Sequence, residues 1–190
     1  MAQAKTLDDK QLRRVQDYIA TRPHAIRNRT MLAVSHLAML RVGEIAALRY
    51  CDVLARDGSI KSEVHLSAEQ TKGKHGRTIY INSRLQKQLA EYVAVYKPTN
   101  PEFKLFYTQK RRREGFSANS LAQYFMYMYR NAGIDGASSH SGRRTGATKI
   151  YSSGASLKVV MQILGHRNLA TTSRYLHVTP DMINKAIELA

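Results

Sequence analysis

Residues 164–178 read LGHRNLATTSRYLHV, and this stretch near the end of the 190-residue chain carries its most specific pattern. His166 precedes Tyr175 by nine residues, and most side chains between them are basic or carry a hydroxyl group. The run TTSR at 171–174 is unfavourable to bury, because polar groups without partners lose hydration in a core. We therefore interpret Tyr175 as a side chain presented for chemistry rather than as one more core aromatic.

The balance of charge indicates a polyanionic partner. Lys and Arg number 30 against 14 Asp and Glu, which gives a formal net charge of +16. Such an excess attracts polyanions, of which nucleic acid is the most common. An anionic membrane surface fits less well, because no separate Lys-rich amphipathic helix or lipidation motif occurs. A basic ribosome-associated protein also fits less well, because helical patterns extend along almost the whole chain without a basic tail.

The remaining composition is that of an ordinary intracellular domain. No apolar run reaches the length of about 18 residues that a transmembrane helix needs. The N-terminus lacks the apolar core of a signal peptide, so we expect a cytoplasmic location. Cys51 is the only cysteine, which excludes an internal disulfide and a cysteine-based zinc site.

Periodicity predicts mostly helices and a small sheet. Helical spacing occurs ahead of Pro23, from residue 24 to about 40, and in a short segment after Gly43. The pair Asp57-Gly58 predicts a tight hairpin, and residues 62–67 and 77–82 read as two further strands. Helices are predicted again at 83–96 and 117–133, and then as pieces broken at Gly142, Gly154, Gly165 and Pro180. We expect a mainly α fold with one small three-stranded antiparallel sheet, of class α+β, in a single domain over residues 1–190.

Three basic segments could hold an oxyanion. Arg41 stands at a helix junction where Glu44 could orient it, although a lone arginine is more often an ordinary surface residue. His140 and Arg143 share a helical face at spacing i, i+3, and two guanidinium groups can grip phosphate oxygens in pairs. That segment reads equally well as a solvated basic face. The hairpin tip at 71–77 carries lysines between glycines, which is a weak signal for phosphate contact.

Together these residues suit phosphoryl transfer. The tyrosine phenol has an ordinary pKa of about 10, so it becomes a nucleophile only where cations stabilise the developing charge. A lysine or histidine could protonate the leaving oxygen. The sequence has neither a carboxylate cluster suited to Mg²⁺ nor a glycine-rich phosphate loop followed by Lys and Ser or Thr. We therefore expect neither a metal nor a nucleotide cofactor.

Four segments of the chain are, in this order, LRVGEIAALR, TKGKHGRTIYI, HSGRRTGAT and LGHRNLATTSRYLHV. Together they resemble the catalytic domain of the tyrosine recombinases, the phage integrase family. The resemblance extends from about residue 7 to the end of the chain. It implies that Tyr175 is the nucleophile, that Glu44 supports the first arginine, and that Lys72 is the general acid with Lys74 as its rival. The implied catalytic set is Arg41, Lys72, His140, Arg143, His166 and Tyr175. Further candidates for DNA contact are Lys74, Arg77, Arg144 and Arg174.

The resemblance implies a definite reaction on double-stranded DNA. Tyr175 would attack a phosphodiester to give a 3′-phosphotyrosyl link and a free 5′-hydroxyl, and a second 5′-hydroxyl would reverse the step. The bond energy is conserved, so neither ATP nor metal is implied. Integration, excision and inversion all remain open as outcomes. Two alternatives also remain open: a DNA-binding regulator that has lost turnover, and a strand-relaxing enzyme of the type IB topoisomerase class.

Both ends of the chain carry further expectations. Only 40 residues precede Arg41, so the separate N-terminal core-binding domain typical of the family is expected to be absent, either in a naturally short recombinase or in a piece of a longer one. The segment after Tyr175 shows an apolar stripe at helical spacing. The resemblance implies that this helix docks on a neighbouring protomer in a homotetramer on DNA, and the alternative is packing on its own domain. Directionality or DNA-bending proteins are expected accessory partners, in a bacterium, an archaeon or a phage.

Overall fold

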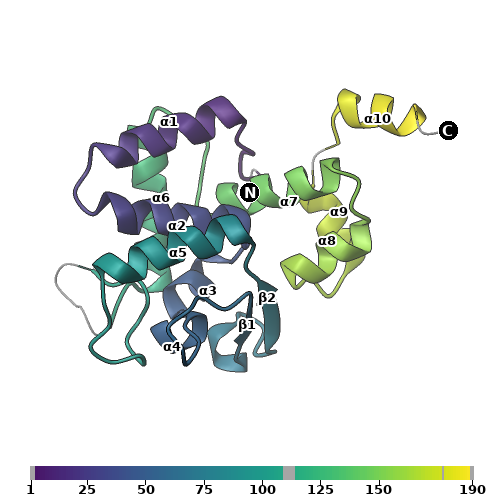
Figure 1. The fold of residues 1–190 in the computed structure, drawn as a ribbon. Coiled ribbons are helices and arrows are strands. Elements are labelled where there is room, and N and C mark those ends of the chain that lie inside the picture. Colours follow the sequence, from purple (N-terminus) through teal and green to yellow (C-terminus); the bar gives the residue numbers. More distant parts are fainter. Residues whose placement is uncertain (1–2, 109–113, 177, 189–190) are drawn as a thin grey trace.

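The computed structural model describes residues 3–108, 114–176 and 178–188. Its elements are α1 (Asp9–Ala20), α2 (Ala25–Leu37), α3 (Val42–Ala47), α4 (Tyr50–Val53), β1 (Glu63–Leu66), the 3₁₀ helix η1 (Ala68–Gln70), β2 (Arg77–Tyr80), α5 (Ser83–Val95), α6 (Ala118–Asn131), α7 (Ser141–Ser152), α8 (Leu157–Leu164), α9 (Leu169–Tyr175) and α10 (Pro180–Ile187). Figure 1 shows α1, α2, α5 and α6 on one side, α8 to α10 on the other, and α7 between them. The mainly α class with a small antiparallel sheet is confirmed.

The number of strands differs from the sequence prediction. Within the described residues the sheet has two strands, β1 and β2, paired antiparallel from Glu63 opposite Tyr80 to Leu66 opposite Arg77. The prediction of a third strand ahead of the turn at Asp57-Gly58 was wrong. That segment forms α4, and only a single bridge joins Leu54 to Ile60 across the turn.

The physical reason lies in the first turn of α4. The Asp52 carboxylate accepts a hydrogen bond from the backbone N–H of Arg49 at 2.7 Å, which satisfies a donor at the helix start. Tyr50 and Val53, spaced i, i+3, are both buried. A helix places both side chains on one face, whereas a strand would point them to opposite faces of the sheet. Too few residues are then left before the turn to make a strand.

Helix α2 is the centre of the main core. It packs against α1, α5 and α7, and seven of its residues are buried. Helix α7 approaches α2 closely because glycines face it. A Cβ built on Gly146 would lie 2.0 Å from the backbone oxygen of His36, and one on Gly142 would lie 2.6 Å from Ser35 Oγ. The crossing therefore depends on the absence of side chains at these two positions.

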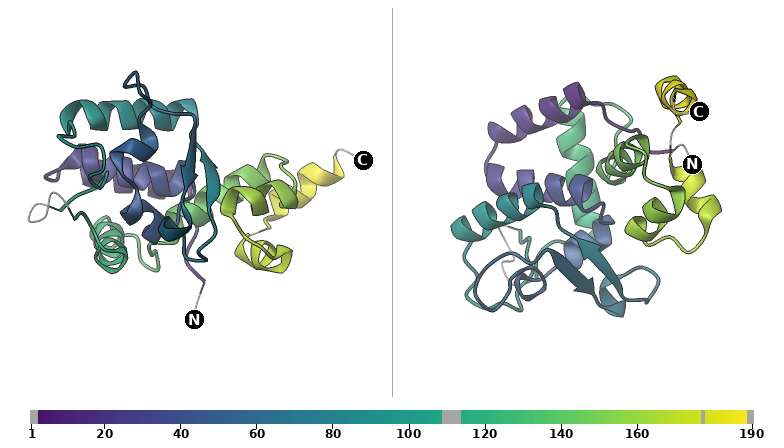
Figure 2. Two further views of the ribbon diagram at one scale, coloured as in Figure 1. Left: turned by 90° about the horizontal axis from the view of Figure 1, so that it is seen from below. Right: turned by 45° about the vertical axis from the view of Figure 1, so that its right-hand side comes forward.

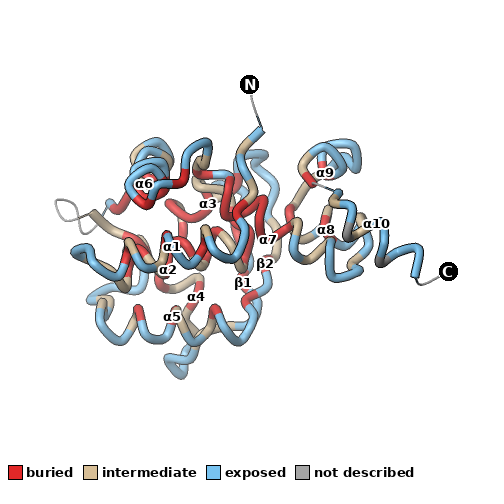
Figure 3. The backbone as a smooth tube through the Cα atoms, turned by 90° about the horizontal axis from the view of Figure 1, so that it is seen from above, coloured by how far each residue is buried: buried red, intermediate tan, exposed pale blue. Residues whose placement is uncertain are grey.

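A second, smaller core joins α7, α8 and α9. Its buried members are Met39, Ala147, Val160, Leu164 and Leu176. Figure 2 shows the same group of helices extending from the body in two further views. Buried residues concentrate around α2 and α7, whereas α8 to α10 are largely exposed (Figure 3). No helix in the described part of the chain is long and apolar enough to cross a membrane.

Candidate active site

Arg41 lies where the chain turns from α2 into α3. Met39 takes a left-handed backbone conformation with φ of 50°, and Arg41 then begins α3 as its N-cap. The Glu44 carboxylate accepts from the Arg41 backbone N–H at 2.7 Å and from its Nη1 at 3.1 Å. The predicted support of Arg41 by Glu44 is thus present as direct contacts.

Glu44 also binds a second arginine and lies near a third. Arg77 donates from Nε to Oε1 at 3.1 Å and from Nη2 to Oε2 at 2.9 Å, which is a bidentate pair. Arg143 Nη1 lies 3.8 Å from Oε2, and the Glu44 side chain is 1% exposed. Burial alone would raise the pKa of Glu44, but the hydrogen bond and charge of Arg77, with the contacts from Arg41, hold it below its ordinary value. One carboxylate therefore faces three guanidinium groups, which leaves the cluster with an excess of positive charge.

The same three arginines cap the C-terminal end of α8. Arg77 donates to the carbonyl of Ile163 at 2.9 Å, Arg143 donates to Leu164, and Arg41 donates to Gly165 at 3.4 Å. Carbonyls in the last turn of a helix have no intrahelical partner and carry the negative end of the helix dipole. The arginine cluster therefore fixes α8, and with it the following turn at His166, against the body of the domain.

Arg143 is the most deeply buried member of the cluster, at 1% exposure. It also donates to the backbone carbonyl of Met39. Burial, followed by repulsion from Arg41, lowers its pKa to about 10, so the guanidinium stays charged at neutral pH. Its carbon Cζ lies 6.0 Å from the centre of the Tyr175 ring. A fixed, dehydrated positive charge thus lies beside the tyrosine.

His166 links Arg143 to helix α9. Its Nε2 lies 3.4 Å from Arg143 Nη2, and its Nδ1 lies 3.0 Å from the Thr172 hydroxyl. Desolvation and the charges of Arg143 and Arg41 lower the pKa of His166 to about 4. The imidazole is therefore neutral at physiological pH. Since Arg143 can only donate, Nε2 accepts and the proton lies on Nδ1, facing Thr172.

Tyr175 ends α9 with its ring edge-on to His166, at 5.4 Å between ring centres and 85° between planes. Its hydroxyl is buried and has no hydrogen-bond partner among the described residues. Burial raises the pKa of this phenol above its ordinary value, although Arg143 and Arg41 oppose the shift. A buried hydroxyl without a partner is unfavourable in a static core and calls for an explanation.

His140 lies at the edge of the cluster, where it begins α7 as an exposed N-cap. Desolvation lowers its pKa, and the charges of Arg143, Arg41 and Lys72 lower it further. The charges of Lys72 and the two arginines therefore act on the same imidazole. These residues come from the first, second and third sequence segments, so the three segments lie near one another.

The two candidate lysines lie differently. Lys72 lines a cavity of about 520 Å³ together with Arg41, Arg77, His166 and Arg167. Lys74 does not line this cavity, and its backbone takes the left-handed conformation with φ of 51°. Both side chains are exposed. Lys72, and not Lys74, therefore shares a cavity with Arg41 and His166.

Two residues named as DNA contacts have other partners. Arg77 faces Glu44 and α8, as described above. Arg144 is buried, and its donors reach the carbonyls of Tyr175 at 2.8 Å and Ala4 at 2.6 Å. Arg174, by contrast, is exposed and makes one long contact of 3.4 Å to Ala170 within its own helix. Of the four candidates, Lys74 and Arg174 retain side chains that are free to reach DNA.

Thr172 is a site residue that sequence reasoning missed, and the expectation that residues 171–174 stay out of the core was wrong at this position, because His166 supplies a partner for its hydroxyl. It is fully buried, and its hydroxyl contacts His166. Its position three residues before Tyr175, on one face of a helix, was the available signal, because residues at i, i+3 share a face. In the described part of the chain, no three His, Cys, Asp or Glu side chains are grouped as a metal site requires.

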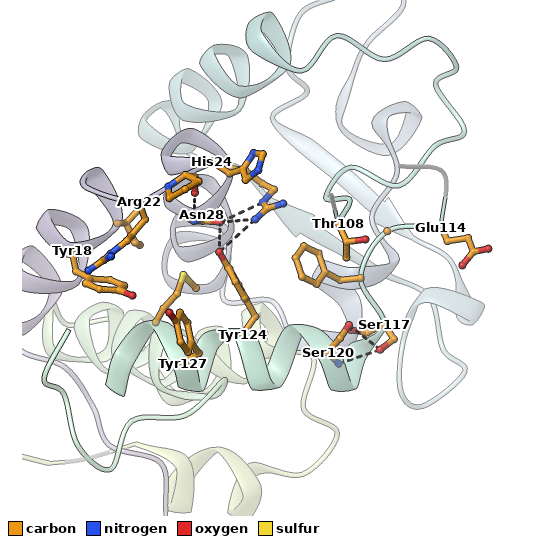
Figure 4. Close-up of a pocket in the computed structure, with 16 residues that line it drawn as sticks. Tyr18, Arg22, His24, Asn28, Thr108, Glu114, Ser117, Ser120, Tyr124 and Tyr127 are labelled. Carbon is orange, nitrogen blue, oxygen red and sulfur yellow. Dashed lines mark hydrogen bonds between the residues drawn. The ribbon is translucent and has the colours of Figure 1, made fainter. Parts of the chain in front are cut away.

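A separate cavity of about 750 Å³ lies between α1, α2 and α6 (Figure 4). Arg27 in its wall is 4% exposed, donates to the carbonyl of Tyr107 at 3.0 Å and lies 5.4 Å from the centre of the Phe116 ring. Tyr124 and Tyr127 stack along α6 at 6.3 Å. None of the residues predicted for the site lines this cavity, so it is distinct from the arginine cluster.

Comparison with known proteins identifies the class and then the family. The fold is similar to that of the XerA recombinase crystal structure, with a TM-score of 0.79 and 22% identity over 100% of this chain and 64% of that chain. It is also similar to XerH recombinase bound to a palindromic difH substrate, with a TM-score of 0.74 and 19% identity over 98% of this chain and 53% of that one. This fold is that of the tyrosine recombinase catalytic domains.

Sequence comparison assigns the family. The model of the phage integrase family matches residues 5–182, and the chain belongs to that family. A tyrosine recombinase of Pseudothermotoga lettingae is 31% identical over 166 residues, which are 85% of this chain and 54% of that protein. Tyrosine recombinase XerC of Lactobacillus leichmannii is 29% identical over 163 residues, which are 83% of this chain and 52% of that protein. The chain thus spans about half the length of the curated relatives it matches.

Proposed function

We propose that residues 1–190 form the catalytic domain of a site-specific recombinase that cleaves and rejoins double-stranded DNA. The observation that carries the proposal is the Tyr175 hydroxyl, buried without a partner among the described residues beside a charged Arg143 and a neutral His166. The three guanidinium groups face only one carboxylate. A phosphodiester bound at the arginine cluster would supply the further negative charge that balances them. Family membership and the net charge of +16 support DNA as the substrate.

The proposed reaction is an in-line displacement at phosphorus. The Tyr175 oxygen forms a bond to phosphorus while the bond from phosphorus to the 5′ oxygen breaks, which leaves a 3′-phosphotyrosyl link. The phenol gives up its proton to the imidazole of His140 or His166, both of which have a lowered pKa. Lys72 donates a proton to the leaving 5′ oxygen. Arg41 and Arg143 stabilise the charge on the non-bridging oxygens. Attack by another 5′-hydroxyl reverses the step and joins the strands.

The decisive experiment is a search for the covalent intermediate. We expect wild-type protein, incubated with supercoiled plasmid and with nicked duplexes from its own genomic neighbourhood, to give a protein–DNA band that survives SDS. Tyr175→Phe should abolish the band, and Arg143→Ala should reduce its rate by about 10³-fold. Tyr127→Phe is the matched control, because Tyr127 is 56% exposed on α6 and lies outside the arginine cluster.

The two alternatives predict different results. A DNA-binding regulator without turnover gives no band with any substrate, although it binds the same DNA. A strand-relaxing enzyme gives the band and relaxes the plasmid, but it does not exchange strands between two sites. Exchange between two copies of one site, lost in Tyr175→Phe, supports recombination over both alternatives.

We also propose that α10 joins protomers into a tetramer on DNA. Its side chains Ile183 and Ile187 are 55% and 69% exposed, and Val178 ahead of it is 54% exposed. Exposed apolar side chains at spacing i, i+4 suit a contact with a second protomer. We propose that the tetramer acts inside the cell of a bacterium, an archaeon or a phage host. DNA-bending or directionality proteins would assist it there.

A pair of variants in α10 tests the assembly. Ile183→Glu places a charge on the apolar stripe, and we expect it to abolish the tetramer on DNA measured by light scattering. Asn184→Glu introduces the same side chain at the next, polar, exposed position and should leave assembly intact. Equal assembly by both variants would contradict the role of α10.

A further inference from the structure

The segment that precedes α1 lies along α7 and reaches α9, the helix that carries Tyr175. Hydrogen bonds join residues 3–7 of this segment to both helices. The segment is anchored at Leu7, which is buried in the main core and donates its backbone N–H to Thr145 Oγ1 at 2.8 Å. The Thr145 hydroxyl in turn donates to the carbonyl of Ser141 at 2.7 Å. One end of the segment is thus fixed on α7.

Arg144 joins the other end of this segment to α9. Its Nη1 donates to the carbonyl of Ala4 and its Nη2 donates to Gln3 Oε1, both at 2.6 Å. Its Nε donates to the carbonyl of Tyr175 at 2.8 Å. Gln3 completes the connection by donating from Nε2 to the carbonyl of Arg174 at 3.0 Å. A single planar guanidinium therefore bridges the N-terminal segment and the residue proposed as nucleophile.

These contacts satisfy the end of a short helix. The carbonyls of Arg174 and Tyr175 belong to the last turn of α9, where the helix itself supplies no donor. In α9 only Thr172 is buried, and Leu176, which follows the helix, is 8% exposed. A seven-residue helix with so little buried surface depends on its caps for order. Gln3 and Arg144 supply donors to those two carbonyls.

We propose that the Gln3 side chain, the backbone of residues 4–7 and Arg144 form an N-terminal clasp that positions Tyr175 for attack. Arg144 is a positioning residue in this arrangement, because it contacts the backbone of Tyr175 and not the reacting atoms. The inference rests on the proposed function for its catalytic consequence, whereas the ordering of α9 stands independently of it. Displacing residues 3 and 4 would free the last turn of α9 and move the phenol away from Arg143.

The test compares two exposed residues of the same segment. Gln3→Ala removes the contacts to Arg144 and Arg174, whereas Lys5→Ala removes only a contact to the carbonyl of Asp135. Arg144→Lys keeps the charge but cannot hold three acceptors in one plane. Each variant is examined by amide hydrogen exchange of α9, by urea unfolding, by DNA affinity, and by the rate of covalent adduct formation at saturating DNA.

We expect Gln3→Ala to speed exchange in α9 and to slow adduct formation by about tenfold, since misplacing a reacting group is costly. Arg144→Lys should slow it further. DNA affinity and global stability of Gln3→Ala should match the wild type, and Lys5→Ala should match it in every measurement. Unchanged exchange in α9 for both Gln3→Ala and Arg144→Lys would overturn the clasp. Loss of affinity without loss of rate at saturation would overturn the positioning role.

The two proposals fail separately. If the wild type forms no adduct, the recombinase function fails, and the exchange of α9 amides still decides whether the clasp orders this helix. If the wild type forms the adduct and Gln3→Ala forms it equally fast despite faster exchange, the clasp orders α9 without positioning Tyr175.

Discussion

At the scale of single residues, the carboxylate of Glu44 compensates the charge of the site. It faces Arg41, Arg77 and Arg143, and its side chain is 1% exposed. Removing one partner of a buried ion pair leaves charge without compensation in a medium of low dielectric constant. The stability of the fold and the net charge of the arginine cluster therefore depend on the same side chain.

Glu44→Gln should lower the free energy of unfolding by about 3–5 kcal/mol, because the buried Arg143 and the partly buried Arg41 and Arg77 then repel one another without a compensating carboxylate. Glu102→Gln is the matched control, since Glu102 also pairs with an arginine at 2.9 Å, but both side chains are exposed. The control should cost about 1 kcal/mol or less. Urea unfolding of both variants measures the difference, and equal losses would show that burial of the Glu44 pair has no energetic consequence.

The low pKa of His166 makes a prediction about pH. Folded, it titrates at about 4, against an ordinary value of 6.5. Between these values the unfolded chain binds a proton that the folded chain does not, so stability rises with pH through this window and is level above it. His166→Asn should remove this contribution. The difference in unfolding free energy between wild type and variant should therefore grow from pH 4.5 to pH 7, and a constant difference would refute the assignment.

At the scale of elements, the crossing of α2 and α7 sets the position of Arg143. Gly142 and Gly146 let the backbones approach, and Arg143 lies between them in sequence. The C-terminal end of α8 then meets the arginine cluster from the other side. The geometry of the site is thus an outcome of helix packing, with each element bringing one or two groups.

Gly146→Ala should separate α7 from α2, because its Cβ would lie 2.0 Å from a backbone oxygen that cannot rotate away. We expect a loss of about 3 kcal/mol or more in unfolding free energy. Gly43→Ala is the control in another helix, where the Cβ would meet Ala118 Cβ at an ordinary 3.8 Å. That variant should be neutral or gain up to about 1 kcal/mol from helix propensity. Similar stability of both variants would contradict the close crossing.

At the scale of the whole molecule, net charge and the arrangement of the elements make different contributions to binding. Under the proposed function, the net charge of +16 attracts DNA to the domain without specifying a face. We propose that the face is specified by the cavity of about 520 Å³, which is lined by the loop between η1 and β2 and by the residues that follow α8. Affinity should therefore depend on the lysines near this cavity more than on lysines elsewhere, although each contributes one unit of charge.

Two lysines test this division. Lys74→Ala should reduce the slope of log binding constant against log salt concentration by about 1, the value of one phosphate contact. Lys97→Ala changes the net charge equally, but Lys97 follows α5 and does not line this cavity, so the slope should stay as in the wild type. Fluorescence anisotropy of a labelled duplex over a salt series measures both slopes. Equal slopes for the two variants would show that binding follows net charge alone.

Much of the fold was accessible from the sequence because it depends on local spacing. The helix predicted at 83–96 runs from Ser83 to Val95, and the one predicted at 117–133 runs from Ala118 to Asn131. The strands predicted at 62–67 and 77–82 are shorter but correctly placed. The third strand was wrong, because Tyr50 and Val53 reach the core on a helical turn.

The sequence by itself determined the helical class, the family and the set of residues to examine, because periodicity and motif spacing are written within short stretches of chain. Only the tertiary structure decided which arginines turn inward. Arg77 pairs with Glu44, 33 positions away, and Arg144 reaches Ala4, 140 positions away. Such partners are chosen by the packing of distant helices, and a guanidinium on a helix face carries no local signal of which carbonyl or carboxylate it will meet.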